Sequence, residues 1–388
     1  MTPWRRLPKV QVGTAAPWVT AITSSRNPAR LLPQAIAHRG YKALFPENSM
    51  SAFEGAVSVG AHAVETDLHM SSDGVVVLSH DPSLKRCFGV DKKIRDCTWE
   101  YLSGLETLRE PREGMPRLLD LLRWMGDKGK EDIWVLLDVK VPALPSTERD
   151  AKELLVAVKR TLDAVPGGAK LWEERIILGL WNATFIRAAR QILPSYPAVL
   201  ITWHLPYAGH FFDIPNLGFN IARPALTGWC GSRFLRRARD ADRPVFAWTV
   251  NEERWMEWCI RKNADATGSN SSSSSDPDGV EGKEEDDGRS NLPKRILIDG
   301  VITDDPKLFL EVCERWEDEQ DSEQGKEKEK EKEMEMVTAK RSSPGLGSSV
   351  GSMAYNLAAP AVMRLFFLYG WWKGKFDYFK DVTRLERW

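Results

Sequence analysis

The sequence predicts a protein of the α/β class built on a TIM (β/α)8 barrel. The first observation is that eight apolar runs, typical of buried parallel strands, alternate along the chain with segments of helical pattern. The second is length, because 388 residues can form a barrel of roughly 250 residues with further segments around it. The third is composition: 42% hydrophobic and 28% charged residues are ordinary for a globular protein and exclude wholesale disorder.

The order of the expected elements follows from these patterns. We expect parallel strands at residues 35–38, 63–68, 133–139, 175–180, 198–203, 217–222, 245–250 and 299–303. The clearest helical segments between them are residues 49–59, 117–125, 150–162, 183–193 and 254–262. This alternation favours a barrel over two separate domains.

Residues 75–79 have a strand pattern but do not fit the parallel set. They follow the second strand after a short Asp-Gly turn, whereas a parallel return needs about a dozen residues or more. We therefore expect an antiparallel hairpin. Because a hairpin brings its two ends together, it places His80 beside Glu65 and Asp67.

The barrel is expected to span residues 35–315, with one interruption and a preceding segment. Residues 264–293 combine a serine run with an acidic stretch and are interpreted as a disordered surface insertion. Residues 1–34 carry basic and no acidic side chains, so we expect a disordered arm or a mitochondrial targeting segment.

Two segments of different character follow the barrel. Residues 316–352 contain alternating Lys and Glu and then Ser and Gly, a pattern of one exposed helix or of a solvated linker. Residues 353–388 hold an apolar stretch, interrupted by Arg364, that is close to the roughly 20 residues of a membrane span. Trp and Tyr beside lysines are typical of interfacial anchors, so we expect this tail to lie in a membrane surface. The alternative is a C-terminal helix that packs on the barrel.

Charge and cysteine content limit the partners and the compartment. A net charge of −1 disfavours a general nucleic-acid binder. The five cysteines show no CxxC spacing, which predicts neither a zinc ribbon nor a disulfide framework. No apolar segment of secretory type is present. We therefore expect an intracellular, membrane-associated protein at the mitochondrial outer surface, the endoplasmic reticulum or lipid droplets. The sequence does not identify a protein partner.

Charged and titratable side chains follow several of the expected strands. They are His38, Arg39, Glu65, Asp67, His80, Asp138 and Lys140. In an α/β barrel the carboxyl ends of the strands form the active face, so we expect these side chains to converge there.

The carboxylates among them have the spacing of a cation site. Glu65 and Asp67 are two residues apart on one strand and therefore point to the same side. Asp138 can complete a group of three from the neighbouring strand. Oxygen ligands without cysteine favour Mg²⁺ or Ca²⁺ over zinc. We expect one divalent cation of either kind.

The remaining side chains suit an anionic substrate. A cation together with Arg39 and Lys140 can hold an anion and stabilise developing negative charge. His38 and His80 offer a general base and a general acid near neutral pH. This combination predicts cleavage of a phosphodiester.

A set of short motifs runs through residues 35–310 in a fixed order. They are His38-Arg39-Gly40, Pro46-Glu47-Asn48-Ser49, Glu65-Thr66-Asp67, Asp73-Gly74, His80-Asp81, Asp138-Val139-Lys140, Trp248-Thr249-Val250-Asn251 and Asp299-Gly300-Val301-Ile302-Thr303-Asp304. In this order they resemble the glycerophosphodiester phosphodiesterase family. Residues 171–181, residues 303–306 and the hydrophobic tail resemble its fungal phosphatidylglycerol phospholipase C branch.

The resemblance implies a metal-dependent barrel with defined roles. By resemblance, His38 and His80 are the acid/base pair, and the phosphate ligands are Arg39 and Lys140. The metal ligands are Glu65, Asp67 and Asp138, with Glu47 as a further candidate, and Trp248 lines the pocket or packs in the barrel. Most family members carry Glu where Asp138 stands. Because Asp is one methylene shorter, a water-bridged contact is an alternative to direct ligation.

The expected activity is phospholipase C-type cleavage of phosphatidylglycerol to diacylglycerol and glycerol 3-phosphate at a membrane surface. Three alternatives stay open. One is a glycerophosphodiester phosphodiesterase that acts on deacylated head groups. Another is a phospholipase D-type barrel that releases head-group alcohols. The last is an inactive barrel that only binds lipid.

Overall fold

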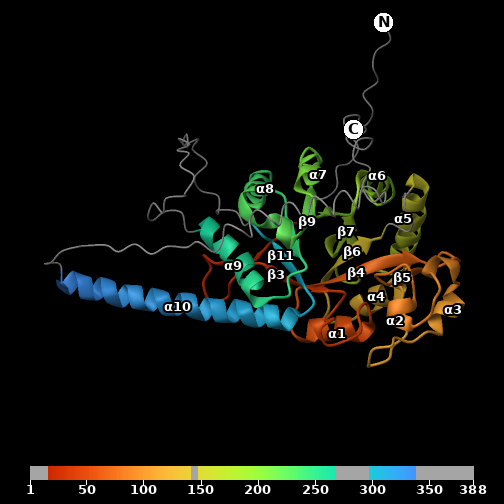
Figure 1. Cartoon of the computed structure of the whole chain (residues 1–388), viewed down its shortest axis with the longest axis horizontal. Helices are drawn as coiled ribbons and strands as arrows, with labels where there is room; N and C mark the ends of the chain where they lie inside the picture. Colours follow the sequence, from red (N-terminus) through yellow and green to blue (C-terminus); the bar gives the residue numbers. More distant parts are fainter. Residues whose placement is uncertain (1–15, 141–146, 268–296, 338–388) are drawn as a thin grey trace, which may run out of the picture.

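The computed structural model describes residues 16–140, 147–267 and 297–337. Its centre is a closed barrel of parallel strands with helices around it (Figure 1). Going round the barrel, the strands follow the order β3-β11-β10-β9-β8-β7-β6-β4, and pairing of β4 with β3 closes the circle. The expected TIM barrel is confirmed. In chain order, its strands are β3 (Gln34–His38), β4 (Ala63–Met70), β6 (Trp134–Val139), β7 (Ile176–Leu180), β8 (Ala198–Thr202), β9 (Leu217–Ala222), β10 (Val245–Trp248) and β11 (Gly300–Thr303).

The expected hairpin is present outside the parallel set. Strand β5 (Val76–Leu78) pairs antiparallel with the end of β4, with Leu68 opposite Leu78. A short excursion then follows, with the small helices α2 (Lys85–Phe88) and α3 (Trp99–Ser103), before the chain enters α4 (Leu118–Met125). Its own apolar cluster, which includes Leu84 and Leu102, holds this excursion against the barrel.

Amphipathic helices cover the outside of the barrel. They are α1 (Met50–Ser58), α4, α5 (Glu148–Asp163), α6 (Ala183–Ile192), α7 (Leu205–Gly209), α8 (Gly228–Asp240), α9 (Glu253–Thr267) and α10 (Pro306–Val337). Side-chain caps fix several of their starts: Ser49 accepts a hydrogen bond from the amide of Ala52 at the start of α1. The alternation predicts a helix where α8 lies but not its bounds, because α8 buries only a narrow face that includes Phe234 and Leu235.

The barrel contains two apolar layers. Alternate strand residues point inward, where Ile36, Trp134 and Phe246 form an inner cluster, and the others pack against the surrounding helices. Gly40 shows how tightly the helices fit, because a Cβ on it would lie 2.6 Å from Ala52 of α1, and its φ of +79° is left-handed.

The N-terminal segment corrects one expectation. Residues 16–34 are not a separate arm but part of the barrel, because Val19 is fully buried in the inner cluster. Strands β1 (Ile22–Thr23) and β2 (Leu31–Leu32) form a small antiparallel pair beside it. The basic side chains then contact acidic side chains in the middle of the last helix: Arg26 pairs with Asp318, and the Arg30 guanidinium lies 2.7 Å from Asp321. Residues 1–15 lie outside the described residues.

The segments after the barrel depart from the expected boundaries. Helix α10 passes residue 315 without interruption and ends at Val337, which agrees with the helical alternative for the charged run. Helix α9 extends to Thr267, so the helix continues past the expected start of the insertion at residue 264. The rest of the insertion and the C-terminal tail lie outside the described residues. Within the part of the chain that the structure describes, no helix is both long and apolar enough to cross a membrane.

Candidate active site

One pocket opens at the carboxyl ends of the barrel strands. It brings together almost all of the side chains singled out from the sequence. Its lining includes His38, Arg39, Glu65, Asp67, His80, Asp138, Lys140 and Trp248. The hairpin returns His80 to the end of β4, as its turn predicted, and parallel register sets Asp67 opposite Asp138 and His38 opposite Glu65. Glu47 is the exception, because it lies outside this lining.

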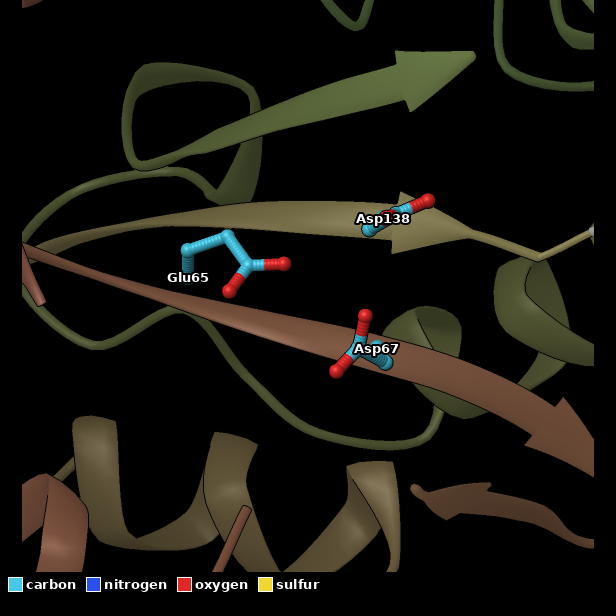
Figure 2. A group of neighbouring side chains, drawn as sticks. All are labelled: Glu65, Asp67 and Asp138. Carbon is cyan, nitrogen blue, oxygen red and sulfur yellow. The ribbon is translucent and has the colours of Figure 1, made fainter. Parts of the chain in front are cut away.

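Three buried carboxylates form a compact group inside the pocket. Figure 2 shows Glu65 and Asp67 on β4, with Asp138 close to the end of the neighbouring β6. One oxygen from each lies within 4.8 Å of the others, and all three side chains are buried. Glu47 is not part of this group. Its carboxylate instead accepts a bond of 3.0 Å from Arg39, so the structure does not support it as a fourth ligand.

The negative charges of the three carboxylates exceed the positive charges beside them. Burial raises the pKa of Glu65 well above its ordinary value, and repulsion by Asp67 and Asp138 raises it further. Burial would also raise the pKa of Asp67, but Lys140 and Arg39 hold it below its ordinary value. Two cations therefore face three carboxylates. A buried oxygen cluster with an excess of negative charge fits a hard divalent cation, held by Glu65, Asp67 and Asp138.

Lys140 and Arg39 sit directly on these carboxylates. The Lys140 ammonium lies 2.8 Å from Asp67 Oδ1 and 2.5 Å from Asp138 Oδ2. The Arg39 Nε lies 3.2 Å from Asp67 Oδ2, and its backbone amide donates to Glu65 at 2.9 Å. Because both side chains also line the pocket, they can attract an incoming anion and donate hydrogen bonds to it.

The loop after β3 owes its shape to two left-handed residues. Arg39 and Asn48 have φ values of 59° and 56°. The Asn48 side chain donates to Asp67 at 2.9 Å and accepts from the Thr66 hydroxyl at 2.7 Å. This pair of bonds ties the loop that follows β3 to the neighbouring strand β4.

Each histidine of the pocket is bound by a carboxylate. His38 Nδ1 lies 2.6 Å from Asp304 Oδ1, and His80 Nδ1 lies 2.7 Å from Asp81 Oδ1. In both histidines, the carboxylate fixes the orientation of the ring and leaves Nε2 to exchange a proton with a ligand. Burial lowers the pKa of His38 and of His80, and the carboxylate of each opposes that effect.

Further side chains hold those carboxylates in turn. Lys42 Nζ and the Asn251 amide each lie 3.1 Å from Asp304 Oδ2. Arg86 Nε donates to Asp81 at 2.6 Å, while its two terminal nitrogens donate to Glu47 at 2.8 and 2.7 Å. Arg86 therefore connects His80, through Asp81, with Arg39, through Glu47.

Two tryptophans, Trp181 and Trp248, line the pocket. The ring of Trp181 lies edge-to-face with those of Trp203 and Trp248, with centroids 5.9 Å apart in both pairs. The Trp181 indole nitrogen donates to Asp138 at 2.7 Å, and that of Trp248 donates to the backbone oxygen of Asn220 at 3.0 Å. Trp248 thus both lines the pocket and packs in the barrel.

For several of these residues, the sequence pattern predicted no role. Asp81 and Asp304 stand in the quoted motifs directly after a histidine and a strand, which is a usable signal. Trp181 follows β7 directly, and strand-end position is again the signal. Arg86 and Asn220 had no such signal: one lies in a helix of four residues and the other in an apolar strand.

Comparisons with known proteins agree with this fold. Residues 38–308 match the model of the glycerophosphoryl diester phosphodiesterase family. A glycerophosphodiester phosphodiesterase of Caldanaerobacter subterraneus is 26% identical over 294 residues, which cover 72% of this chain and 97% of the relative. A lysophospholipase D of Rattus norvegicus is 41% identical over 266 residues, covering 60% of this chain and 82% of the relative.

A solved structure provides a separate comparison of the backbone. The phosphodiesterase of Oleispira antarctica, solved in complex with the product sn-glycerol-3-phosphate, superposes with a TM-score of 0.53. It covers 73% of this chain and 97% of that protein at 19% identity. At this identity the likeness shows a shared fold.

Proposed function

The chain belongs to the glycerophosphoryl diester phosphodiesterase family, and from this premise we propose that it hydrolyses glycerophosphodiesters to glycerol 3-phosphate and an alcohol. Membership makes it a phosphoric diester hydrolase. The observation that carries the proposal is the pair of carboxylate-bound histidines, His38 and His80, in the lining of one pocket with the carboxylate group.

The substrate phosphate is proposed to bind between Arg39 and Lys140. Both carry their charge into a buried setting, where they can stabilise negative charge on the phosphoryl oxygens. A divalent cation held by Glu65, Asp67 and Asp138 would supply further charge stabilisation at the same place. The geometry does not choose between Mg²⁺ and Ca²⁺.

The two histidines divide the proton transfers. One takes the proton from the 2-hydroxyl of the glycerol arm, whose oxygen then forms a new bond to phosphorus. The other gives its proton to the oxygen of the departing alcohol as the old phosphorus–oxygen bond breaks. The product of this step is a cyclic glycerol phosphate. Water then opens the ring with the proton roles of the histidines reversed, which leaves glycerol 3-phosphate and restores the protein.

The relatives support this substrate more than the phospholipase C reading. One relative is named as a glycerophosphodiester phosphodiesterase and another as a lysophospholipase D. The Oleispira enzyme binds sn-glycerol-3-phosphate as a product. Neither relative is named as a phosphatidylglycerol phospholipase C, so that activity becomes the second candidate. The aromatic rings of Trp181 and Trp248 in the pocket lining, which suit a lipid-linked substrate, are the observation that favours it.

The membrane assignment is likewise a proposal. It rests on the aromatic and basic composition of residues 353–388, which lie outside the described residues. An enzyme of soluble diesters would use such a tail for location only, whereas an enzyme of phospholipids would gain local substrate concentration from it.

Product analysis separates the candidate activities, because they differ in the phosphoester bond that is cleaved or in the substrate that is accepted. Full-length protein with Mg²⁺ or Ca²⁺ is offered glycerophosphocholine, lysophosphatidylcholine in detergent, and phosphatidylglycerol vesicles. We expect glycerol 3-phosphate and choline from the first substrate, lost in His38→Ala and His80→Ala. Diacylglycerol from phosphatidylglycerol, with no cleavage of glycerophosphocholine, would overturn the proposal in favour of the second candidate. Glu131→Gln, on the opposite end of the barrel, serves as the unchanged control.

A further inference from the structure

We propose that Asn220 is a specificity residue that accepts a hydrogen bond from the terminal hydroxyl of the substrate's glycerol arm. By this contact the site selects a deacylated glycerol over an acylated one. The inference rests on the proposed function and deepens it, because glycerophosphodiesters and lysophospholipids share the scissile bond and differ at that hydroxyl.

Asn220 brings a buried polar side chain into the pocket. It lies on β9, its side chain contributes to the pocket lining, and the residue is only 3% exposed. Among the described residues its Oδ1 atom is buried without any hydrogen-bond partner. Its neighbours in that lining include the apolar Ile201 and Ile302. A buried carbonyl oxygen without a partner is costly, so its presence in a ligand pocket points to a partner that arrives with the ligand.

The fold also fixes where that partner must be. In the closed barrel β9 is the fourth strand from β4 in either direction, so Asn220 faces Glu65 and Asp67 across the mouth. The phosphate binds at the β4 side, near Lys140 and Arg39. One of the two groups esterified to the phosphate must therefore extend into the pocket. The end of that group farthest from the phosphate is the part that reaches Asn220.

The glycerol arm meets this requirement. Its 2-hydroxyl is engaged by a histidine during the reaction, and the terminal hydroxyl extends beyond it, away from the phosphate. A hydroxyl can donate to Asn220 Oδ1, whereas an acyl ester at the same position has no hydrogen to donate. An acylated arm would leave the oxygen unpaired and would also have to fit an acyl chain beside Ile201.

The backbone of Asn220 does not depend on its side chain. The backbone oxygen accepts from the Trp248 indole, and the register with Phe246 and Ile201 holds the strand on both sides. Removal of the side-chain amide should therefore change ligand recognition without loss of the fold. Asn220→Leu, which has nearly the same shape and no polar atom, tests this directly.

The experiment compares two substrates in two proteins. One substrate is glycerophosphocholine. The other is the phosphocholine diester of propane-1,2-diol, which keeps the 2-hydroxyl and lacks only the terminal one. For the natural protein we expect kcat/KM to fall about 10- to 100-fold on the deoxy substrate, the factor for one hydrogen bond to a buried group. Asn220→Leu should show the same loss on glycerophosphocholine and no further loss on the deoxy substrate.

Other outcomes overturn the inference. Equal losses on both substrates in Asn220→Leu would mean that the residue acts structurally, and equal rates of the natural protein on both would mean that the hydroxyl is not read. Ile201→Val, which alters the same wall without a polar atom, should leave the ratio between the substrates unchanged. The midpoint of thermal unfolding of Asn220→Leu should be unchanged or higher, and a marked fall would contradict the unpartnered oxygen. If Asn220→Leu does not fold, Asn220→Ala takes its place.

Lysophosphatidylcholine provides an independent test of the inference about Asn220. The natural protein should prefer glycerophosphocholine, and Asn220→Leu should reduce that preference. A natural preference for lysophosphatidylcholine contradicts the inference while leaving phosphodiester hydrolysis intact. Failure of the natural protein on every glycerophosphodiester would instead contradict the proposed function itself.

Discussion

His38 Nδ1 lies 2.6 Å from Asp304 Oδ1, although 266 positions in the sequence separate the two residues. The contact exists because the first and last strands of the barrel, β3 and β11, are neighbours in parallel register. Lys42 and Asn251 hold the other oxygen of the same carboxylate. Burial alone would raise the pKa of Asp304, but its bond to His38 lowers that pKa to about 2. It therefore stays an ionised acceptor at any working pH and fixes the ring of His38.

Asp304→Asn should lower kcat by about 100-fold or more, because proton transfer by a poorly oriented histidine loses most of its advantage. The variant keeps the shape of the side chain, so the fold should persist. The loss should remain above about pH 8, well beyond the ordinary histidine pKa of about 6.5, because the cause is orientation and not charge. A loss confined to acidic pH would show that Asp304 acts on protonation alone. Asp132→Asn, at the other end of the barrel, is the matched control.

Arg86→Lys should lower kcat by roughly 10- to 100-fold with little change in KM. A lysine lacks the planar fork that donates to Asp81 through Nε and to Glu47 through both terminal nitrogens, so the carboxylate that orients His80 loses support. Steady-state kinetics on glycerophosphocholine measure the split between kcat and KM. Lys85→Met, at the exposed neighbouring position, should leave both constants near their original values. A rise in KM alone would place Arg86 in substrate binding instead.

The outline of the fold was accessible from the sequence because burial on both faces gives parallel strands a continuous apolar pattern. The hairpin was also predictable, since its turn was too short for a parallel return. The bounds of helix α8 were not, because its arginine-rich sequence buries only a few side chains. The folding of residues 16–34 into the barrel was missed for a related reason: composition describes the whole segment, whereas the contact of Val19 with the inner cluster depends on the finished barrel.

The residues of the site likewise divide into those that the sequence pattern predicts and those that it does not. The histidines, carboxylates and Lys140 were predictable because they follow strands, and the carboxyl ends of barrel strands must converge. Arg86 lies in an excursion whose path no strand pattern determines. Asn220 sits inside an apolar run, where only the closed barrel shows that its side chain faces the pocket. Residues placed by local rules could be found, and residues placed by tertiary structure could not.

Addition of Ca²⁺ or Mg²⁺ should raise the midpoint of thermal unfolding, because the cation relieves repulsion among Glu65, Asp67 and Asp138. At about 100 times its dissociation constant a bound ion stabilises by roughly 2.7 kcal/mol, equivalent to about 5–10 °C for a domain of this size class. A chelator should remove this shift together with the activity. Glu65→Gln should abolish most of the shift, and Glu131→Gln should retain it. An equal shift in both variants would place the ion elsewhere.

Val19→Ala tests whether the N-terminal segment belongs to the barrel. The side chain is fully buried in the inner cluster with Ile36 and Phe246, so its truncation should lower the free energy of unfolding by about 1–3 kcal/mol through lost contacts and a small cavity. Val156→Ala removes the same atoms from an exposed position on α5 and should change stability by less than about 0.5 kcal/mol. Denaturant unfolding of both variants provides the comparison. Equal stability of the two would mean that Val19 does not fill the barrel, and that residues 16–34 are the separable arm that their composition suggested.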